Sequence, residues 1–542
     1  MRGVLSRAGG RMVSAGNTIT TAAAPVSARL RCTPPLPAPR MAEVRRRAIF
    51  ECCKWDPQVG DTAVLADFAV TLTPSQWREL AALAQTLYAE TLAAEREILG
   101  RRDLLERLFL PRKIARVLQN AGAGGAGDAS GAGALPPPEN TFRVMRFDFH
   151  PTCDGWRVTE VNSDVPGGYI EASGFSELMR DELARAGPAP VSFGVFEKCD
   201  SVVAQATSLL ECANAIDVKA GWQPALRRFA LAGNPAEQIA QNLRARLPDG
   251  GRVALVHATA YTDDRQVMIF LQRILERHGF GVTLASPAEI SWRDGAAFVA
   301  SARGAGDASG ARGARDARDA EDAEGARSAE VRDEKLDALF RFFPAEWLPN
   351  LDGGAWENFF LPAKFPRTLF INPGAAMISQ TKCFPLAWSG FADGAPAAWS
   401  RLMPETRALP DALPDALRGW PASLLRALRP LRPRPAPLPD AANWLVKPSL
   451  GRVGDSIGLA GVTSEKDMAK IQKDCRHHPR RWVAQRRFES EPLSTPRGPA
   501  HICIGVYVIN GSACGIYGRI APQPLINHLA QDAAVLLLQD DA

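Results

Sequence analysis

The sequence predicts a mixed α/β and α+β fold with more than one domain, and three observations support this class. The chain has 542 residues, a length that usually corresponds to two to four domains. Residues 253–285 read as a strand, a helix and a second strand, the pattern of an open parallel sheet. Residues 441–530 instead alternate short strands with turns, which indicates an α+β unit.

Composition excludes several classes of protein. No run of eighteen apolar residues occurs, so no transmembrane helix is expected. The formal charge of +5 arises from residues 1–48, which hold nine arginines and one acid, Glu43, and the remaining chain lacks the basic excess of a nucleic-acid-binding protein. The ten cysteines form no CxxC pair, which argues against zinc or a disulfide scaffold and fits the reducing cytosol.

Residues 1–48 are expected to be a disordered leader. Residues 1–42 contain no acid and have the composition of an organellar transit peptide. The alternative is that translation starts at Met41 and that the protein is cytoplasmic. Three further stretches, 120–138, 301–329 and 391–440, are rich in Ala, Gly or Pro, and we expect them to be loop insertions because they bury too little apolar surface.

Two helices are expected before the first strands. Thr73-Pro74-Ser75-Gln76 is a capping box with Pro at the first helical position, and apolar residues at helical spacing carry the helix to about Leu99. A second helix is expected from Leu104 to Leu118. The parallel-sheet unit follows later, with strands at Val253–His257 and Val282–Ala285 around a helix at Arg265–Arg277.

The segment 142–164 carries the most chemical information. Two alternating runs flank the turn cluster Pro151–Gly155, which predicts an antiparallel hairpin. If the pairing is centred on Asp154, Asp148 lies opposite Glu160 and Arg146 lies opposite Asn162. Two facing carboxylates repel each other unless a cation lies between them, and the Asp/Glu/Asn oxygens suit Mg²⁺. The alternative is a hairpin in which Arg146 neutralises both acids.

The segment 443–458 predicts a strand that delivers Lys447 into a glycine-rich loop. Glycines let backbone N–H groups approach a phosphate, and Lys447 and Arg452 add positive charge. The alternative is an ordinary glycine-rich turn. Lys382 also lies in an apolar stretch, where it could contact phosphate or extend to the surface. Nearer the C-terminus, Asn510-Gly511 predicts a hairpin turn, with Arg519 just past its second strand.

Together these segments resemble the synthetase module of glutathionylspermidine synthetase and the related circularly permuted ATP-grasp amide ligases. The resemblance runs from about Trp55 to the end of the chain, interrupted by the three insertions. The ordered matches are Arg146, Asp148, Glu160 and Asn162 in the hairpin, Lys382, the loop residues Lys447, Pro448, Gly451, Arg452 and Gly454, the Trp-x-x-Gln residues Trp482 and Gln485, and Arg519.

The resemblance implies ATP-dependent joining of a small-molecule or peptide carboxylate to an amine through an acyl phosphate, with no nucleic-acid or membrane partner. It assigns Asp148, Glu160 and Asn162 to Mg²⁺, with ATP as the second cofactor. It assigns Lys382, Lys447, Gly451, Gly454 and Gln485 to nucleotide binding, and Arg146, Arg519 and Arg452 to catalysis, with Arg452 on a mobile loop.

The resemblance also implies a division of the chain into an ATP-grasp core and an inserted pre-ATP-grasp open-sheet domain. Residues 49–200 would hold the helical start and the magnesium hairpin, and residues 201–345 would form the inserted domain. Residues 346–542 would form the nucleotide-binding part of the core.

Gly167-Gly168 stands where the family commonly has hydroxyl residues near its peptide substrate. This difference puts glutathione in doubt as the substrate but leaves the ATP chemistry intact. The main hypothesis is therefore an ATP-dependent carboxylate–amine ligase. The alternatives are glutathionylspermidine synthesis proper and a catalytically silent binding protein.

Overall fold

The structure is a computed structural model, and all structural statements concern the residues that it describes. These are residues 30–55, 58–59, 62–123, 140–185, 229–302, 331–351, 354–409, 440–451, 454 and 456–539.

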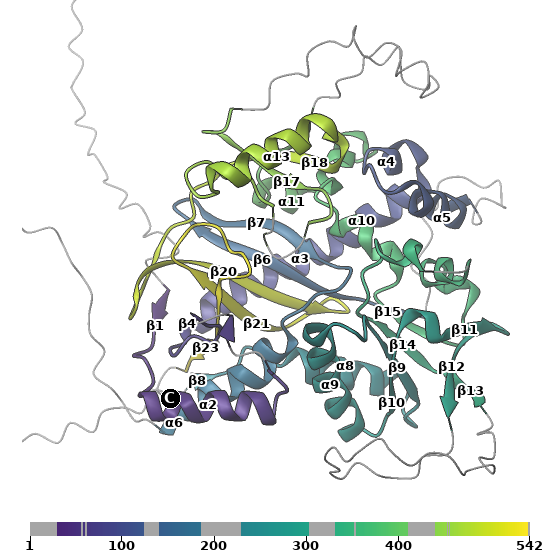
Figure 1. The fold of residues 1–542 in the computed structure, drawn as a ribbon, viewed down its shortest axis with the longest axis horizontal. Coiled ribbons are helices and arrows are strands. Elements are labelled where there is room, and N and C mark those ends of the chain that lie inside the picture. The colour runs from purple at the N-terminus through teal and green to yellow at the C-terminus, as the bar shows by residue number, and fades with distance from the viewer. Residues whose placement is uncertain are drawn as a thin grey trace, which may run out of the picture.

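An antiparallel sheet lies at the centre of the molecule, and the predicted hairpin forms one side of it (Figure 1). Its strand order is β22-β21-β20-β6-β7, with β19 paired to β20. The strands are β6 (Val144–Thr152), β7 (Gly155–Asn162), β19 (Leu493–Thr495), β20 (Gly498–Ile509), β21 (Ser512–Ala521) and β22 (Gln531–Ala533).

Both hairpin predictions are confirmed. β6 and β7 are antiparallel and joined through Cys153 and Asp154, and Arg146 lies opposite Asn162 as expected. The register shifts by one residue between Phe147 and Phe149, so a β-bulge places Thr159 and Glu160 of β7 across from Asp148 alone. The expected one-to-one pairing of Asp148 with Glu160 is therefore wrong. The Asn510-Gly511 turn joins β20 and β21, and both residues have positive φ, as a two-residue hairpin requires. Arg519 lies within β21, however, and not past its end.

The two faces of the central sheet differ in polarity because side chains alternate along each strand. Phe147 of β6, Val506 of β20 and Ile516 of β21 are buried in the apolar core on one face. The long helix α3 (Pro74–Gly100) packs there and contributes Leu80 and Leu87. Its N-terminus is closed by the capping box between Thr73 and Gln76, as predicted.

The second predicted helix is wrong as a single element, because it is interrupted. α4 (Arg102–Glu106) ends early and α5 (Arg112–Ala123) begins anew. Phe109 adopts a positive φ, and Pro111 disfavours a helical conformation at the residue before it.

A parallel sheet with the order β10-β9-β14-β15-β5 lies beside the central sheet, and the predicted strand–helix–strand unit is part of it. The chain leaves β9 towards β10 on one side and returns to β14 on the other, so the connections reverse direction between β9 and β14. Ligands commonly bind at such a reversal, beyond the carboxyl ends of the strands. The elements are β5 (Thr141–Phe142), α8 (Pro235–Arg246), β9 (Arg252–Val256), α9 (Thr262–Arg277), β10 (Gly281–Ala285), β14 (Ala338–Arg341) and β15 (Leu369–Ile371).

Several short elements flank this sheet. An antiparallel sheet, β11-β12-β13, packs next to it. The strands are β11 (Ile290–Arg293), β12 (Ala296–Ala302) and β13 (Val331–Leu336), and the short helices are η2 (Pro287–Glu289), η3 (Leu348–Asn350), η4 (Gly354–Phe360), η5 (Pro362–Lys364), η6 (Gly374–Ala376), α10 (Met377–Gln380) and η7 (Phe384–Gly390).

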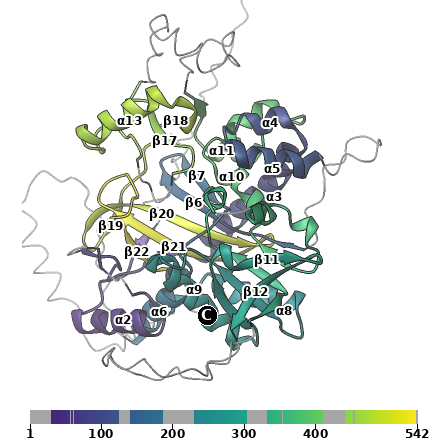
Figure 2. The same ribbon diagram turned by 45° about the vertical axis from the view of Figure 1, so that its right-hand side comes forward.

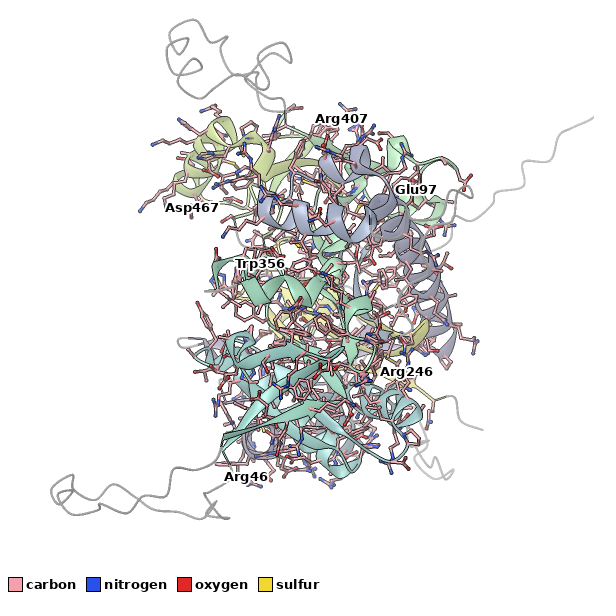
Figure 3. The ribbon with its side chains drawn as sticks, turned by 90° about the vertical axis from the view of Figure 1, so that its right-hand side faces the viewer. Arg46, Glu97, Arg246, Trp356, Arg407 and Asp467 are labelled. Atoms are coloured by element: carbon pink, nitrogen blue, oxygen red, sulfur yellow. The ribbon has the colours of Figure 1, made fainter. Side chains whose placement is uncertain are left out.

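A small antiparallel sheet, β16-β18-β17, and helix α13 form a unit at the top of Figures 1 and 2. Its elements are α11 (Ala397–Leu402), β16 (Thr406–Ala408), β17 (Trp444–Pro448), α13 (Glu465–His477), η10 (Pro479–Arg481) and β18 (Trp482–Arg486). Figure 3 labels Arg407 and Asp467 on this unit and Arg46 at the opposite end of the molecule. Residues 397–408 were assigned to the Pro-rich insertion, but they fold here: Trp399 of α11 is buried and β16 pairs with β18.

Both ends of the described chain meet in a fifth sheet, β1-β4-β23-β8. The disordered leader is therefore wrong for residues 30–48. Met41, Val44 and Ala48 form one apolar stripe on α2 and are buried. The elements are β1 (Arg31–Cys32), α2 (Ala38–Phe50), β2 (Gln58–Val59), β3 (Thr62–Ala63), β4 (Val70–Leu72), a π-helical turn (Glu171–Phe175), α6 (Ser176–Arg185), β8 (Phe229–Ala230) and β23 (Val535–Leu538).

Large parts of the other expected insertions (120–138 and 301–329), and residues 1–29, lie outside the described residues. Among the residues that are described, no helix is both long enough and apolar enough to cross a bilayer.

A buried ion pair ties the parallel sheet to the hairpin. Arg341 at the end of β14 donates to Asp164 Oδ1 at 2.5 Å, and both side chains are only 1% exposed. Asp164 Oδ2 accepts a hydrogen bond from the backbone N–H of Ala345 at 3.0 Å. Every partner of this pair is protein, so removing either charge would leave the other unpaired in the interior.

We therefore expect Arg341→Met to lower the free energy of unfolding by about 3–5 kcal/mol, the usual cost of leaving one buried charge alone. The matched control is Arg102→Met, which removes an exposed pair with Glu106 and should cost less than about 1 kcal/mol. Urea denaturation of the three proteins measures both values. Similar losses in the two variants would contradict the assigned role of the Arg341–Asp164 pair.

Candidate active site

A cavity of about 970 Å³ lies over the polar face of the central sheet. Strand β17 and its glycine-rich loop form one wall, and Tyr261 and Phe342, which follow the carboxyl ends of β9 and β14, form another. The sequence-predicted residues that line it are Arg146, Asp148, Glu160, Asn162, Lys382, Lys447, Gly451, Gly454 and Arg519. The structure thus brings together side chains from opposite ends of the chain.

Arg146 and Asp148 form a closed pair on β6. The guanidinium donates to both carboxylate oxygens of Asp148, at 2.7 Å from Nε and 2.9 Å from Nη2. Arg146 Nη1 donates to the carbonyl of Gly167 at 2.7 Å, and the group stacks over the ring of Tyr517. Asn162 donates to Asp148 Oδ2 at 3.0 Å. With all these contacts made, Arg146 is placed to orient Asp148 and the 163–168 loop.

Glu160 faces a different cation. Lys382 Nζ lies 2.9 Å from Glu160 Oε2 and donates to the carbonyl of Gly451 at 2.7 Å. Burial acts to raise the pKa of Glu160, but the ammonium groups of Lys382 and Lys447 outweigh it and lower the pKa. The carboxyl group is therefore ionised at neutral pH. Lys382 also fixes the beginning of the glycine-rich loop against the hairpin.

Lys447 is buried and makes no hydrogen bond or ion pair with any residue that the structure describes. Burial lowers the pKa of Lys447 to about 8, while the carboxylate of Glu160 opposes this shift and Lys382 adds to it. A buried ammonium without a direct partner is a strong attractor for an anion, because its desolvation is already complete.

Arg519 on β21 contacts two residues, Asn527 and Asp532, that were not predicted from the sequence. Its Nη2 donates to the carbonyl of Asn527 at 2.5 Å, and its Nε lies 3.8 Å from Asp532 Oδ1. Asp532 Oδ2 in turn accepts from Lys54 Nζ at 3.3 Å, and Lys54 also pairs with Glu171. No local pattern could have revealed this cluster, because Lys54 and Asp532 are 478 positions apart.

Of the two glycines that depart from the family pattern, only Gly168 is required for a steric reason. Gly168 has φ +91°, and a Cβ there would lie 2.8 Å from the Tyr507 hydroxyl. Tyr507 uses that hydroxyl to donate to the carbonyl of Gly167. Gly167 itself has room, since its Cβ would meet only Phe342 at 3.9 Å. A larger residue is therefore excluded at Gly168 only.

The oxygen set of the hairpin fits Mg²⁺, which prefers one or two carboxylates and completes its shell with water and phosphate oxygens. Asp148 and Glu160 supply two carboxylates on the cavity wall, and Asn162 supplies an amide next to them. No group of three or more His, Cys, Asp or Glu residues with metal-binding geometry occurs in the described part of the chain. A metal would therefore rely on ligands from the substrate.

Two predicted residues are not placed in the cavity. Gln485 on β18 is buried behind Glu160, where its amide donates to Thr406 at 3.1 Å and its oxygen has no hydrogen-bond partner among the described residues. Arg452 lies outside the described residues. Its catalytic assignment therefore stays a prediction from the sequence.

Comparison with known proteins agrees with the predicted resemblance. Residues 302–534 match the family model described as glutathionylspermidine synthase preATP-grasp. No curated protein matches the sequence. A similar solved structure is a glutathione synthetase-like effector from Globodera pallida, with 8% identity, a TM-score of 0.48, and coverage of 93% of this chain and 98% of that one.

A second similar structure is a putative gamma-glutamylcysteine synthetase from Methylobacillus flagellatus KT. It has 11% identity and a TM-score of 0.32, and the alignment covers 82% of this chain and 87% of that one. The family match confirms the resemblance to the glutathionylspermidine synthetases and, together with the sheets described above, the ATP-grasp fold class.

The lowered pKa of Lys447 predicts how affinity for ATP, the cofactor that the sequence resemblance implies, would depend on pH. A triphosphate would bind the ammonium form, which predominates below about pH 8 and is lost above it. We expect affinity to fall above pH 8 by up to about tenfold per pH unit, because each binding event must then take up one proton.

The measurement is ATP titration followed by calorimetry between about pH 7 and pH 10. Lys447→Met should bind ATP more weakly at neutral pH and should lose this alkaline dependence, whereas Lys470→Met, on the exposed face of α13, should behave like the parent. An alkaline loss of affinity that persists in Lys447→Met would assign it to another group.

Proposed function

We propose that the protein is an ATP- and Mg²⁺-dependent carboxylate–amine ligase that works through an acyl phosphate. One observation carries the proposal. Lys447, which is buried, and Lys382, whose side chain is 9% exposed, line the same cavity as the hairpin carboxylates Asp148 and Glu160. Cations for a triphosphate and oxygen ligands for its metal thus share one cavity, as phosphoryl transfer requires.

The positions of the side chains suggest their roles. Lys382 and Lys447 hold the triphosphate at the wall formed by β17, and the loop through Gly451 and Gly454 lets its backbone approach the phosphates. Mg²⁺, held by Asp148, Glu160 and Asn162 together with phosphate oxygens, would neutralise the charge on the transferred group.

The reaction would proceed in two displacements. The substrate carboxylate attacks the γ-phosphate and ADP leaves, which gives an acyl phosphate. The amine then attacks the acyl carbon, loses a proton and displaces inorganic phosphate. Arg519, with its guanidinium on the cavity wall, stabilises the charge that develops in both steps. Arg146 acts through Asp148, which it holds in one orientation.

The adenine has a suitable place near the small sheet. Leu445 of β17, Leu459 and Phe488 line the cavity on that side and offer apolar contact area for a purine ring. This assignment places the γ-phosphate towards the hairpin and leaves the end of the cavity near Tyr261 for the two other substrates.

We expect Asp148→Asn and Glu160→Gln each to lower the rate of ADP release by at least about 100-fold, the usual loss when one preorganised electrostatic contact is removed. The assay offers ATP and Mg²⁺ with a panel of peptides and amines, and the mass of the product identifies the substrate pair. The matched control is Asp154→Asn, in the exposed turn of the same hairpin, which should keep full activity.

Full activity of Asp148→Asn and Glu160→Gln would refute the assigned roles. Binding of ATP without ADP release, for every substrate pair tested, would instead support the catalytically silent alternative.

A further inference from the structure

Lys54 places an ammonium group in the cavity wall, between two carboxylates. Its Nζ pairs with Glu171 Oε1 and lies 3.3 Å from Asp532 Oδ2. All three side chains are buried and all three line the cavity. The proposed reaction does not use Lys54 or Glu171, so the cluster needs an explanation of its own.

The backbone holds Lys54 in this position at some cost. Cys53, directly before it, has φ 60°, a left-handed conformation that residues other than glycine seldom adopt. The backbone N–H of Lys54 donates to the carbonyl of Ala48 at 2.9 Å, which fixes the chain as it leaves α2. The side chain is thereby turned inwards, away from solvent.

Glu171 is positioned by an equally unusual element. It begins a π-helical turn, Glu171–Phe175, a rare conformation that is found frequently at functional sites. The turn packs so closely on the segment before Lys54 that a Cβ at Gly174 would lie 2.5 Å from Cys52 Sγ. Two strained or rare backbone segments therefore meet where the ammonium and the carboxylate pair.

The pKa of Lys54 shows that the carboxylates of Glu171 and Asp532 hold this lysine in its charged form. Burial acts to lower the pKa of Lys54, but the carboxylates of Glu171 and Asp532 outweigh it and raise the pKa, so the group stays charged. Burial and the carboxylate of Glu171 raise the pKa of Asp532. Without Lys54, the two buried carboxylates would therefore take up a proton or another cation. Asp532 also lies 3.8 Å from Arg519, which places the cluster next to the proposed transfer site.

The structure assigns Glu171 and Asp532 as an ammonium-binding site that opens on the cavity and that Lys54 fills from within the chain. Extended to catalysis, the inference rests on the proposed function. An amine substrate finds no free buried carboxylate pair beside Arg519, so a diamine or polyamine gains no added binding there over an amine with one positive charge.

The remaining acids at that end of the cavity do not replace the occupied pair. Asp263 and Asp264 line the cavity in the first turn of α9, where the helix N-terminus offsets part of their charge. Asp263 is exposed to solvent, so its attraction for a second ammonium is screened.

The test of the ammonium site is the variant Lys54→Met, which keeps the length of the side chain and removes its charge. Ethylammonium chloride is the probe, and thermal unfolding is the readout, because a ligand that binds only the folded state raises the melting temperature. Lys54→Met should bind ethylammonium at least about tenfold more tightly than the parent, since a charge-assisted pair becomes available.

Three controls define the result. Tetramethylammonium cannot donate a hydrogen bond and should have no effect beyond that of sodium chloride. Lys335→Met, which removes an exposed lysine of β13, should respond like the parent. Lys54→Met/Glu171→Gln restores the charge balance but removes one carboxylate, and it should not respond to ethylammonium.

If Lys54→Met does not fold alone, ethylammonium should restore a cooperative unfolding transition and tetramethylammonium should not. No response of Lys54→Met to ethylammonium, folded or unfolded, would overturn the ammonium site. An equal response in Lys54→Met/Glu171→Gln would also overturn it, because the carboxylate pair would then be irrelevant.

Selectivity is tested with butylamine and 1,4-diaminobutane as acceptors, using the carboxylate substrate found by ADP release. The ratio of kcat/KM for the diamine to that for the monoamine should rise about tenfold or more in Lys54→Met, the effect of one added charge-assisted contact, and stay constant in Lys335→Met. An unchanged ratio would overturn the selectivity. Absence of ADP release in the parent would refute the proposed function, while the melting experiment would still decide the ammonium site.

Discussion

The charged face of the central sheet is the constraint on which the rest of the structure depends. One face is apolar and covered by α3, and the other carries Arg146, Asp148, Glu160 and Arg519. A buried charge costs free energy unless it is paired, and each of these four charges has a partner. The partners come from the same strand for Arg146, from the loop before η7 for Glu160, and from β22 for Arg519. Pairing thus brings distant segments of the chain together around one cavity.

The hairpin and its polar face could be predicted from the sequence because strand alternation and turn chemistry are local. Arg146 faces Asn162 as the count of residues requires. The ammonium groups of both lysines from apolar stretches, Lys382 and Lys447, act on the carboxylate of Glu160. Two features could not be predicted. The β-bulge at Asp148 inserts one residue without any sequence signal, and the break before α5 depends on the conformation of Phe109 as well as on Pro111.

The contacts of Lys54 could not be predicted from the sequence, for a different reason. An arginine-rich, proline-containing N-terminal segment has the composition of a leader, yet its apolar stripe docks on α6 and carries Lys54 to the cavity. Burial of Met41, Val44 and Ala48 outweighs the charge of the segment, because Arg46 is exposed and the half-buried Arg40 and Arg47 pair with Glu182 and Glu51. Composition reports the average of a segment, whereas docking depends on the side chains of one face.

The pairing of Glu160 with Lys382 has a consequence for how the proposed ligands would bind. The same ammonium cannot serve Glu160 and a triphosphate fully, since its three donors already include one to Gly451 and one to Glu160. If phosphate took Lys382, Glu160 would lose its nearest counter-charge on the cavity wall and would become a ligand for a cation. Nucleotide and divalent metal would then bind with positive coupling, because each removes the cost that the other creates. Asp148, which keeps Arg146 as its own partner, would contribute less to that coupling than Glu160.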